Sequence, residues 1–187
     1  EDIHEFLEHY GSMVILGHSM GGKAAMVLSI KAPQLVEKLV VADIAPVSYP
    51  HDNTQYVRAM KNVQLDNIVT RGDALMQLAE TVPEPELQNF FAQSLDLKNK
   101  RWKLNLDVLE REMEKIVSFP RLSGQYDKAS LFVSGALSKY VQIKDRPVIK
   151  KLFPKAKFST IENAGHWLHA EKPREFEAVV RTFLNNI

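Results

Sequence analysis

Four short apolar runs, separated by segments with helical periodicity, dominate the pattern of hydrophobic and polar positions along the chain. The runs are rich in β-branched and aromatic residues and predict strands at residues 13–16, 38–42, 130–134 and 158–161. The first run is bounded by glycine and indicates a strand buried on both faces. Apolar positions at helical spacing predict helices at residues 3–10, 20–31, 146–153 and 174–185. This alternation predicts a parallel α/β sheet flanked by helices and joined by right-handed crossovers.

Residues 47–120 interrupt this alternation, because they show no strand pattern. Helices are expected there around residues 57–63, 74–81, 86–95 and 104–117. We therefore expect two parts, an α/β core made of residues 1–46 and 121–187 and a helical insertion at 47–120. Several large apolar side chains of the insertion could line an acyl pocket or pack its helices together, namely Leu75, Met76, Leu78, Phe90, Phe91 and Trp102.

Composition narrows the functional classes. The 187 residues include 24 Lys and Arg against 23 Asp and Glu, and this near balance, mixed along the chain, offers no basic stripe for nucleic acid. The chain has no cysteine, which excludes disulfides, thiolate metal sites and a cysteine nucleophile. The apolar run at 13–16 is far shorter than a transmembrane span, so we expect no transmembrane segment. Nothing in the sequence implies a metal or an organic cofactor.

The sequence Gly17-His18-Ser19-Met20-Gly21 lies between the first predicted strand and the helix that follows it. In this context a G-x-S-x-G match predicts a sharp turn that presents a nucleophilic serine, here Ser19. Small residues at Gly17 and Gly21 are expected to let the strand and the helix pass closely. The backbone N–H of Met20, at the start of the helix, is a candidate donor to an oxyanion.

A serine hydroxyl needs a base, and His166 is the candidate. It follows the last predicted strand within Asn163-Ala164-Gly165-His166-Trp167, where glycine permits a tight turn. His18, beside the turn, is better suited to packing or hydrogen bonding than to titration. His169 is expected to organise the same loop.

A third group, a carboxylate that orients the imidazole, is harder to place. The loop after the next-to-last strand, residues 134–140, contains no Asp or Glu. Asp43 ends the strand after the serine turn, and a parallel sheet would bring it to the same edge as Ser19. We therefore predict Asp43 as the acid. Asp107 is the alternative, although the helix pattern puts it on a polar face.

These segments together resemble the serine α/β-hydrolases, and more narrowly the small esterases of the YbfF type and their mitochondrial animal relatives, the abhydrolase-domain-containing proteins of the eleventh type. The resemblance is carried by GHSMGGKAAM at 17–26, DIAPVSYP at 43–50, WKLNLDVL at 102–109 and NAGHWLHAEKP at 163–173. It implies that Ser19, His166 and Asp43 form the triad, with a serine in the 134–140 loop. It also implies that residues 47–120 form a helical cap over the acyl pocket.

The resemblance further implies hydrolysis of a carboxylic ester or thioester, a small-molecule substrate, through an acyl-serine intermediate. Acyl transfer to an alcohol and a non-catalytic binding role are the alternatives, and neither the acyl chain nor the oligomeric state follows from the sequence. In such hydrolases the serine follows several strands, whereas here it is residue 19. We therefore expect an N-terminally incomplete domain, lacking the first strands, the second oxyanion donor and any transit peptide. An animal-type protein would be mitochondrial, and otherwise an intracellular, cytoplasmic location is expected.

Overall fold

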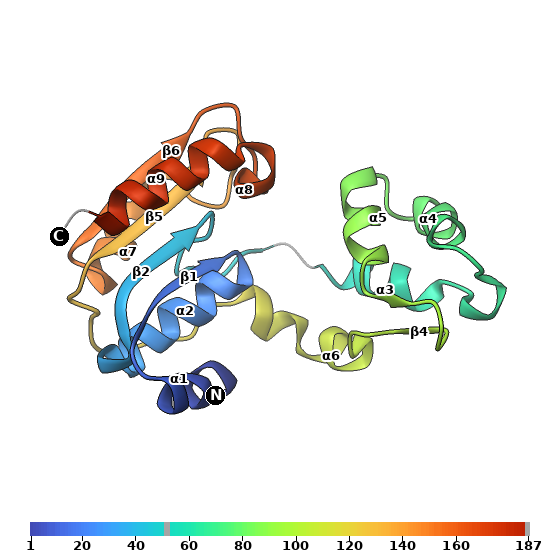
Figure 1. Cartoon of the computed structure of the whole chain (residues 1–187), viewed down its shortest axis with the longest axis horizontal. Helices are drawn as coiled ribbons and strands as arrows, with labels where there is room; N and C mark the ends of the chain where they lie inside the picture. Colours follow the sequence, from blue (N-terminus) through green and yellow to red (C-terminus); the bar gives the residue numbers. More distant parts are fainter. Residues whose placement is uncertain (51–52, 186–187) are drawn as a thin grey trace. The chain divides into compact units, whose positions relative to one another are not determined.

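A computed structural model describes residues 1–50 and 53–185 (Figure 1). The chain divides into two compact units. One consists of Glu1–Ser48 and Phe119–Ile187, and the other of Tyr49–Ser118. Each unit has its own hydrophobic core.

The first unit contains a parallel four-stranded sheet. Its strands are β1 (Met13–His18), β2 (Val36–Ala42), β5 (Ser130–Gly135) and β6 (Ala156–Ile161), in the order β1-β2-β5-β6. The helices are α1 (Asp2–Tyr10), α2 (Met20–Lys31), α7 (Arg146–Leu152), α8 (Leu168–Glu171) and α9 (Pro173–Asn185), and short 3-10 turns occupy Pro33–Leu35 and Ile143–Asp145. The four predicted strands and the helices predicted around them are confirmed, with boundaries that shift by one or two residues.

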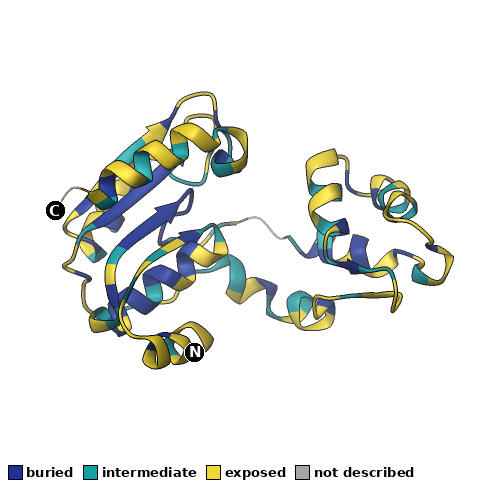
Figure 2. Ribbon diagram, in the orientation of Figure 1, coloured by how far each residue is buried: buried dark blue, intermediate teal, exposed yellow. Residues whose placement is uncertain are grey.

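Alternate residues of the central strands bury opposite faces of the sheet. Val40 and Val133 belong to a cluster that includes Phe183 of α9. On the other face, Phe132 packs on Phe153 just after α7, with ring centroids 5.5 Å apart. Strands β2 and β5 are accordingly buried along most of their length (Figure 2). Because the sheet is parallel, the residues that follow each strand gather at one edge.

Strand β1 differs from the prediction, because it is not buried on both faces. It is an edge strand of the sheet, and Val14 and Leu16 are 41% and 47% exposed. The apolar run identified the strand correctly, but the burial of its side chains depends on which elements cover each face of the sheet, and a single segment does not encode that.

The second unit is mainly helical, with α3 (Thr54–Asn62), a 3-10 turn at Leu65–Asn67, α4 (Arg71–Ala79), α5 (Pro85–Ala92) and α6 (Leu106–Val117). The prediction that this region has no strand is wrong in one detail. Leu95–Asp96 (β3) and Arg101–Trp102 (β4) form a short antiparallel pair. Two-residue strands are too short to leave an alternating pattern.

Most of the large apolar side chains of this unit pack its core. Leu78 is fully buried, Phe91 packs against the same cluster, and the Trp102 indole N–H donates to the Met60 carbonyl at 2.9 Å. Met76 and Phe90 are instead 68% and 49% exposed. Within the described residues, none of the helices has the length and apolar character needed to cross a membrane.

Candidate active site

Ser19 occupies the turn between β1 and α2. Its φ of 52° and ψ of −122° form a strained conformation for a residue with a side chain. The turn is held by the Ser19 N–H, which donates to the Ala42 carbonyl at 3.0 Å, and by the Lys23 N–H, which donates to the Ser19 carbonyl at 3.1 Å. Met20 is the first residue of α2, and N–H groups of a first helical turn lack a partner within the helix.

Two glycines at this turn lie in close contact with other backbone or side-chain atoms. They are Gly17 and Gly22, whereas the predicted pair was Gly17 and Gly21. A Cβ added at Gly17 would lie 2.4 Å from the Gly21 carbonyl oxygen, so the expectation for Gly17 is confirmed. The expectation for Gly21 is wrong, because an added Cβ there would meet no atom of another segment within 4 Å in the described part of the chain. The second close approach is at Gly22, where a Cβ would lie 2.6 Å from Ile44 Cγ2. Helix α2 therefore also packs closely against the segment after β2, a contact that the sequence did not predict.

Asp43 follows β2 at the same edge and is completely buried. Its φ is 51°, so it shares with Ser19 a backbone conformation that is uncommon for residues with side chains. Three donors surround its carboxylate: the Gly135 N–H at 3.2 Å from Oδ1, the Ser138 hydroxyl at Oδ2, and the His166 Nδ1–H at 2.7 Å from Oδ2. A buried carboxylate requires such donors, since burial without them is costly.

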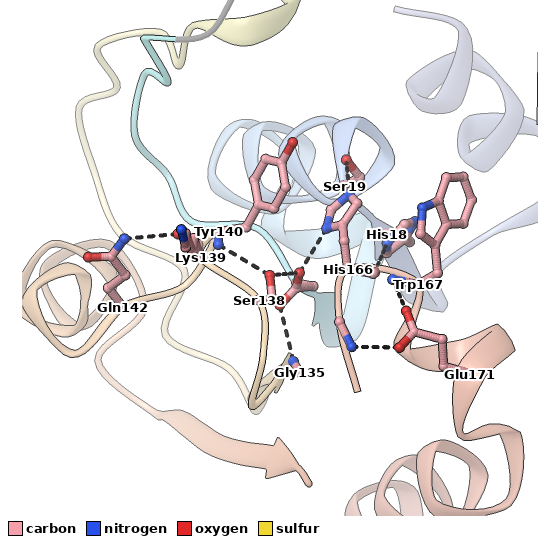
Figure 3. Close-up of polar contacts among 12 residues, drawn as sticks. His18, Ser19, Gly135, Ser138, Lys139, Tyr140, Gln142, His166, Trp167 and Glu171 are labelled. Carbon is pink, nitrogen blue, oxygen red and sulfur yellow. Dashed lines mark hydrogen bonds and ion pairs between the residues drawn. The ribbon is translucent and has the colours of Figure 1, made fainter. Parts of the chain in front are cut away.

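His166 joins the three groups into one chain of hydrogen bonds (Figure 3). A carboxylate only accepts, so the Nδ1–H of the imidazole donates to Asp43. The ring then has a free lone pair on Nε2. This atom lies 3.0 Å from Ser19 Oγ and accepts a hydrogen bond from the Ser19 hydroxyl group. Tyr140 stacks on the imidazole with ring centroids 4.1 Å apart. The structure therefore brings together Ser19, His166 and Asp43, in the tautomer that leaves Nε2 able to act as a base.

Asp107 is placed elsewhere. It lies near the start of α6 in the second unit, and its carboxylate accepts from Lys61 Nζ at 2.7 Å. The Asp107 side chain is 82% exposed. The structure thus puts Asp43 against the imidazole, while Asp107 pairs with Lys61 inside its own unit.

Several contacts of the site were not predicted from the sequence. Gly135 supports the His166 loop, because a Cβ there would lie 2.2 Å from the Gly165 carbonyl oxygen. The Glu171 carboxylate accepts from the backbone N–H groups on both sides of His166, as Figure 3 shows. Ser138 lies in the loop where the resemblance implied a serine. In the sequence, Glu171 is one carboxylate among many. Its two hydrogen bonds form only once the loop that carries His166 folds back on α8.

The two neighbouring histidines also contact this loop. His18 Nε2 lies 2.8 Å from the His166 carbonyl oxygen, and burial lowers the pKa of its imidazole. His169 packs edge-on against His18, with ring centroids 4.6 Å apart. In residues 1–50 and 53–185, the structure has no group of three or more His, Cys, Asp or Glu side chains arranged to hold a metal ion.

A strained serine after a parallel strand, a histidine loop after the last strand and a buried carboxylate at the same edge define the hydrolase class of α/β folds. Residues 1–179 match the model of the alpha/beta hydrolase family. This chain belongs to that family.

Similar proteins agree with this assignment. The chain is 38% identical to the sn-1-specific diacylglycerol lipase ABHD11 of Danio rerio, over 94% of this chain and 58% of that protein. It is 34% identical to Esterase YbfF of Escherichia coli, over 91% of this chain and 66% of the relative. A solved marine microorganism esterase superposes with a TM-score of 0.91 at 36% identity, covering 97% of this chain and 74% of that one. The chain thus spans about three fifths of the length of the curated lipase it matches, and the predicted α/β-hydrolase fold is confirmed.

Proposed function

We propose that this protein hydrolyses carboxylic esters or thioesters through an acyl-serine intermediate on Ser19. The observation that carries the proposal is the continuous hydrogen-bond chain from Ser19 Oγ to His166 Nε2 and from His166 Nδ1 to Asp43. The names of two similar proteins, a diacylglycerol lipase and an esterase, support an ester as the substrate.

In the first half of the reaction, Ser19 Oγ attacks the acyl carbon while His166 Nε2 removes its proton. The carbonyl oxygen becomes an oxyanion, for which the Met20 N–H at the positive end of α2 is a donor. Collapse of the tetrahedral intermediate breaks the bond to the leaving group. The imidazolium returns the proton to the departing alkoxide or thiolate, and the acyl group remains on Ser19.

In the second half, water replaces the leaving group. His166 Nε2 takes a proton from water, the hydroxide oxygen attacks the acyl-serine, and the proton is then returned to Ser19 Oγ as the carboxylic acid departs. The buried Asp43 carboxylate stabilises the imidazolium in both halves, since it lies 2.7 Å from Nδ1 and is shielded from water.

The hydrolysis is tested by assaying the purified protein with a short-chain aryl ester. Ser19→Ala is expected to lower the turnover number by about 10³-fold or more, since the nucleophile is removed. Ser12→Ala is a matched control, because Ser12 is exposed and bonds only to the surface residue Glu37 in the described structure. Equal turnover by the wild type and Ser19→Ala would overturn the proposal.

Product analysis in the presence of a competing alcohol separates hydrolysis from acyl transfer. Free acid as the main product is expected, whereas accumulation of a new ester would identify an acyltransferase. The role of the helical unit as a cap over the acyl pocket, and a mitochondrial location, stay predictions.

A further inference from the structure

The peptide groups on both sides of His166 are bound by one carboxylate. The Gly165 N–H donates to Glu171 Oε2 at 2.7 Å, and the Trp167 N–H donates to Glu171 Oε1 at 3.1 Å (Figure 3). Each carboxylate oxygen therefore takes one of the two N–H groups that flank the histidine. Hydrogen bonds to an ionised acceptor are shorter and stronger than those to a neutral one.

The carbonyl of His166 itself is bound from a different element. His18, the last residue of β1, lies with Nε2 2.8 Å from that oxygen. A carbonyl can only accept, so His18 Nε2 carries a proton and donates. The lowered pKa of His18, caused mainly by burial, favours the neutral ring. Its ring also lies against the imidazole of His166, with centroids 4.6 Å apart.

The loop has little room to move in other directions. A Cβ at Gly165 would lie 3.2 Å from Glu171 Oε1, so the backbone approaches the carboxylate closely. The Gly165 carbonyl also lies against Gly135 at the end of β5, where an added Cβ would meet it at 2.2 Å. Sheet, carboxylate and His18 thus contact the same short stretch of backbone.

We propose that His18 and Glu171 are positioning residues for the reaction, forming a backbone clamp that fixes the imidazole of His166 between Ser19 and Asp43. The inference rests on the proposed function and adds to it the part that holds the base. The Nε2 lone pair must point at Ser19 Oγ while Nδ1–H points at Asp43, and both directions follow from the orientation of one backbone segment. Small errors in such an alignment reduce rates strongly.

A purely structural role for Glu171 is the competing explanation, since Glu171 is also the last residue of the short helix α8. The two roles differ in what a substitution changes. A structural residue affects stability alone, whereas a positioning residue lowers the rate of the folded enzyme and leaves the binding of substrate nearly unchanged.

Glu171→Gln is the sharpest variant, because it keeps the shape but replaces one accepting oxygen with an NH₂ group that cannot accept. We expect the rate of Ser19 modification by a fluorophosphonate, and kcat for an aryl ester, to fall by about 10- to 100-fold with little change in KM. Glu171→Asp retains the carboxylate and should recover part of the rate. Glu175→Gln, an exposed position in the first turn of α9, is the matched control.

His18 provides a second, independent pair of variants. His18→Gln places an amide donor near the position of Nε2 and should retain more activity than His18→Leu, which has no donor. The downfield proton NMR signal of His166 Nδ1–H gives a readout that stability alone does not move. It should broaden or weaken in Glu171→Gln and His18→Leu at unchanged unfolding temperature, and stay sharp in Glu175→Gln.

The outcomes separate the two proposals. Slower labelling of a folded Glu171→Gln, with partial recovery in Glu171→Asp, supports the clamp. Wild-type rates in both Glu171→Gln and His18→Leu, while Ser19 still labels in the wild type, overturn the clamp and leave the proposed function standing. Absence of labelling in folded wild-type protein overturns both. If Glu171→Gln fails to fold, the two His18 variants decide between the explanations. Slower labelling of folded His18→Leu than of His18→Gln supports the clamp, and wild-type rates in both variants overturn it.

Discussion

Asp43→Asn replaces one oxygen of a buried carboxylate with an NH₂ group. In the wild type that carboxylate accepts from the Gly135 N–H, the Ser138 hydroxyl and the His166 Nδ1–H. With the amide oxygen facing Gly135, the NH₂ group faces the other two partners. The Ser138 hydroxyl can rotate and accept. His166 can accept only by moving its proton from Nδ1 to Nε2, and it then donates to Ser19 and cannot act as its base.

The size of the effect follows from this tautomer change. A triad held in the wrong tautomer loses about 10⁴-fold in kcat. The fold suffers less, because the amide still pairs with Gly135 and only the charge-assisted bonds are weakened. We expect a loss of about 1–3 kcal/mol in the free energy of unfolding, the range for disturbing a buried hydrogen-bonded group.

The assay combines initial rates of aryl ester hydrolysis with urea unfolding of the same preparations. Asp107→Asn is the matched control, because Asp107 is exposed and pairs with Lys61, and its kcat should stay close to that of the wild type. The reasoning would be refuted if folded Asp43→Asn kept kcat within tenfold of the wild type, or if Asp107→Asn showed the larger loss.

Three further predictions concern stability. Gly22→Ala should lower the free energy of unfolding by about 1–3 kcal/mol, because its Cβ would lie 2.6 Å from Ile44 Cγ2, and an equally stable variant in urea titration would contradict the packing. Burial lowers the pKa of Lys23 from 10.5 to about 8, so between pH 8 and pH 10.5 the unfolded chain binds more protons than the folded one. The free energy of unfolding should therefore rise with pH across this range, by at most about 3 kcal/mol, and Lys23→Met should abolish the rise. Asn105→Ala removes the side-chain cap of α6 and should cost about 1 kcal/mol in thermal unfolding, with no loss arguing against the cap.

The parts of the site that the sequence predicted are those with local signals. An apolar run followed by glycines and a helical segment identified the turn of Ser19, and a glycine before a histidine identified the loop of His166. Asp43 could be chosen because parallel strands end at one edge, so that topology alone brings it near Ser19. These inferences needed only neighbouring residues and one rule of sheet geometry.

The features that could not be predicted depend on contacts between distant segments. Val14 is 41% exposed although its apolar run by itself predicts burial on both faces, because burial depends on which distant elements cover each face of the sheet. Glycine is needed at position 22, and not at 21, because the Ile44 side chain lies where a Cβ of residue 22 would be, and the position of Ile44 is known only from the folded structure. Glu171 gave no distinctive signal, since its two backbone partners are recognisable only once the loop has folded back on α8.

Covalent trapping tests the central claim most directly. The folded protein is incubated with a fluorophosphonate, digested, and mapped by mass spectrometry beside Ser19→Ala and His166→Ala. We predict a single adduct on Ser19 in the wild type, none in Ser19→Ala, and labelling slowed by orders of magnitude in His166→Ala, because the hydroxyl then lacks its base. An adduct on another residue, or equal labelling of the wild type and His166→Ala, would contradict the account.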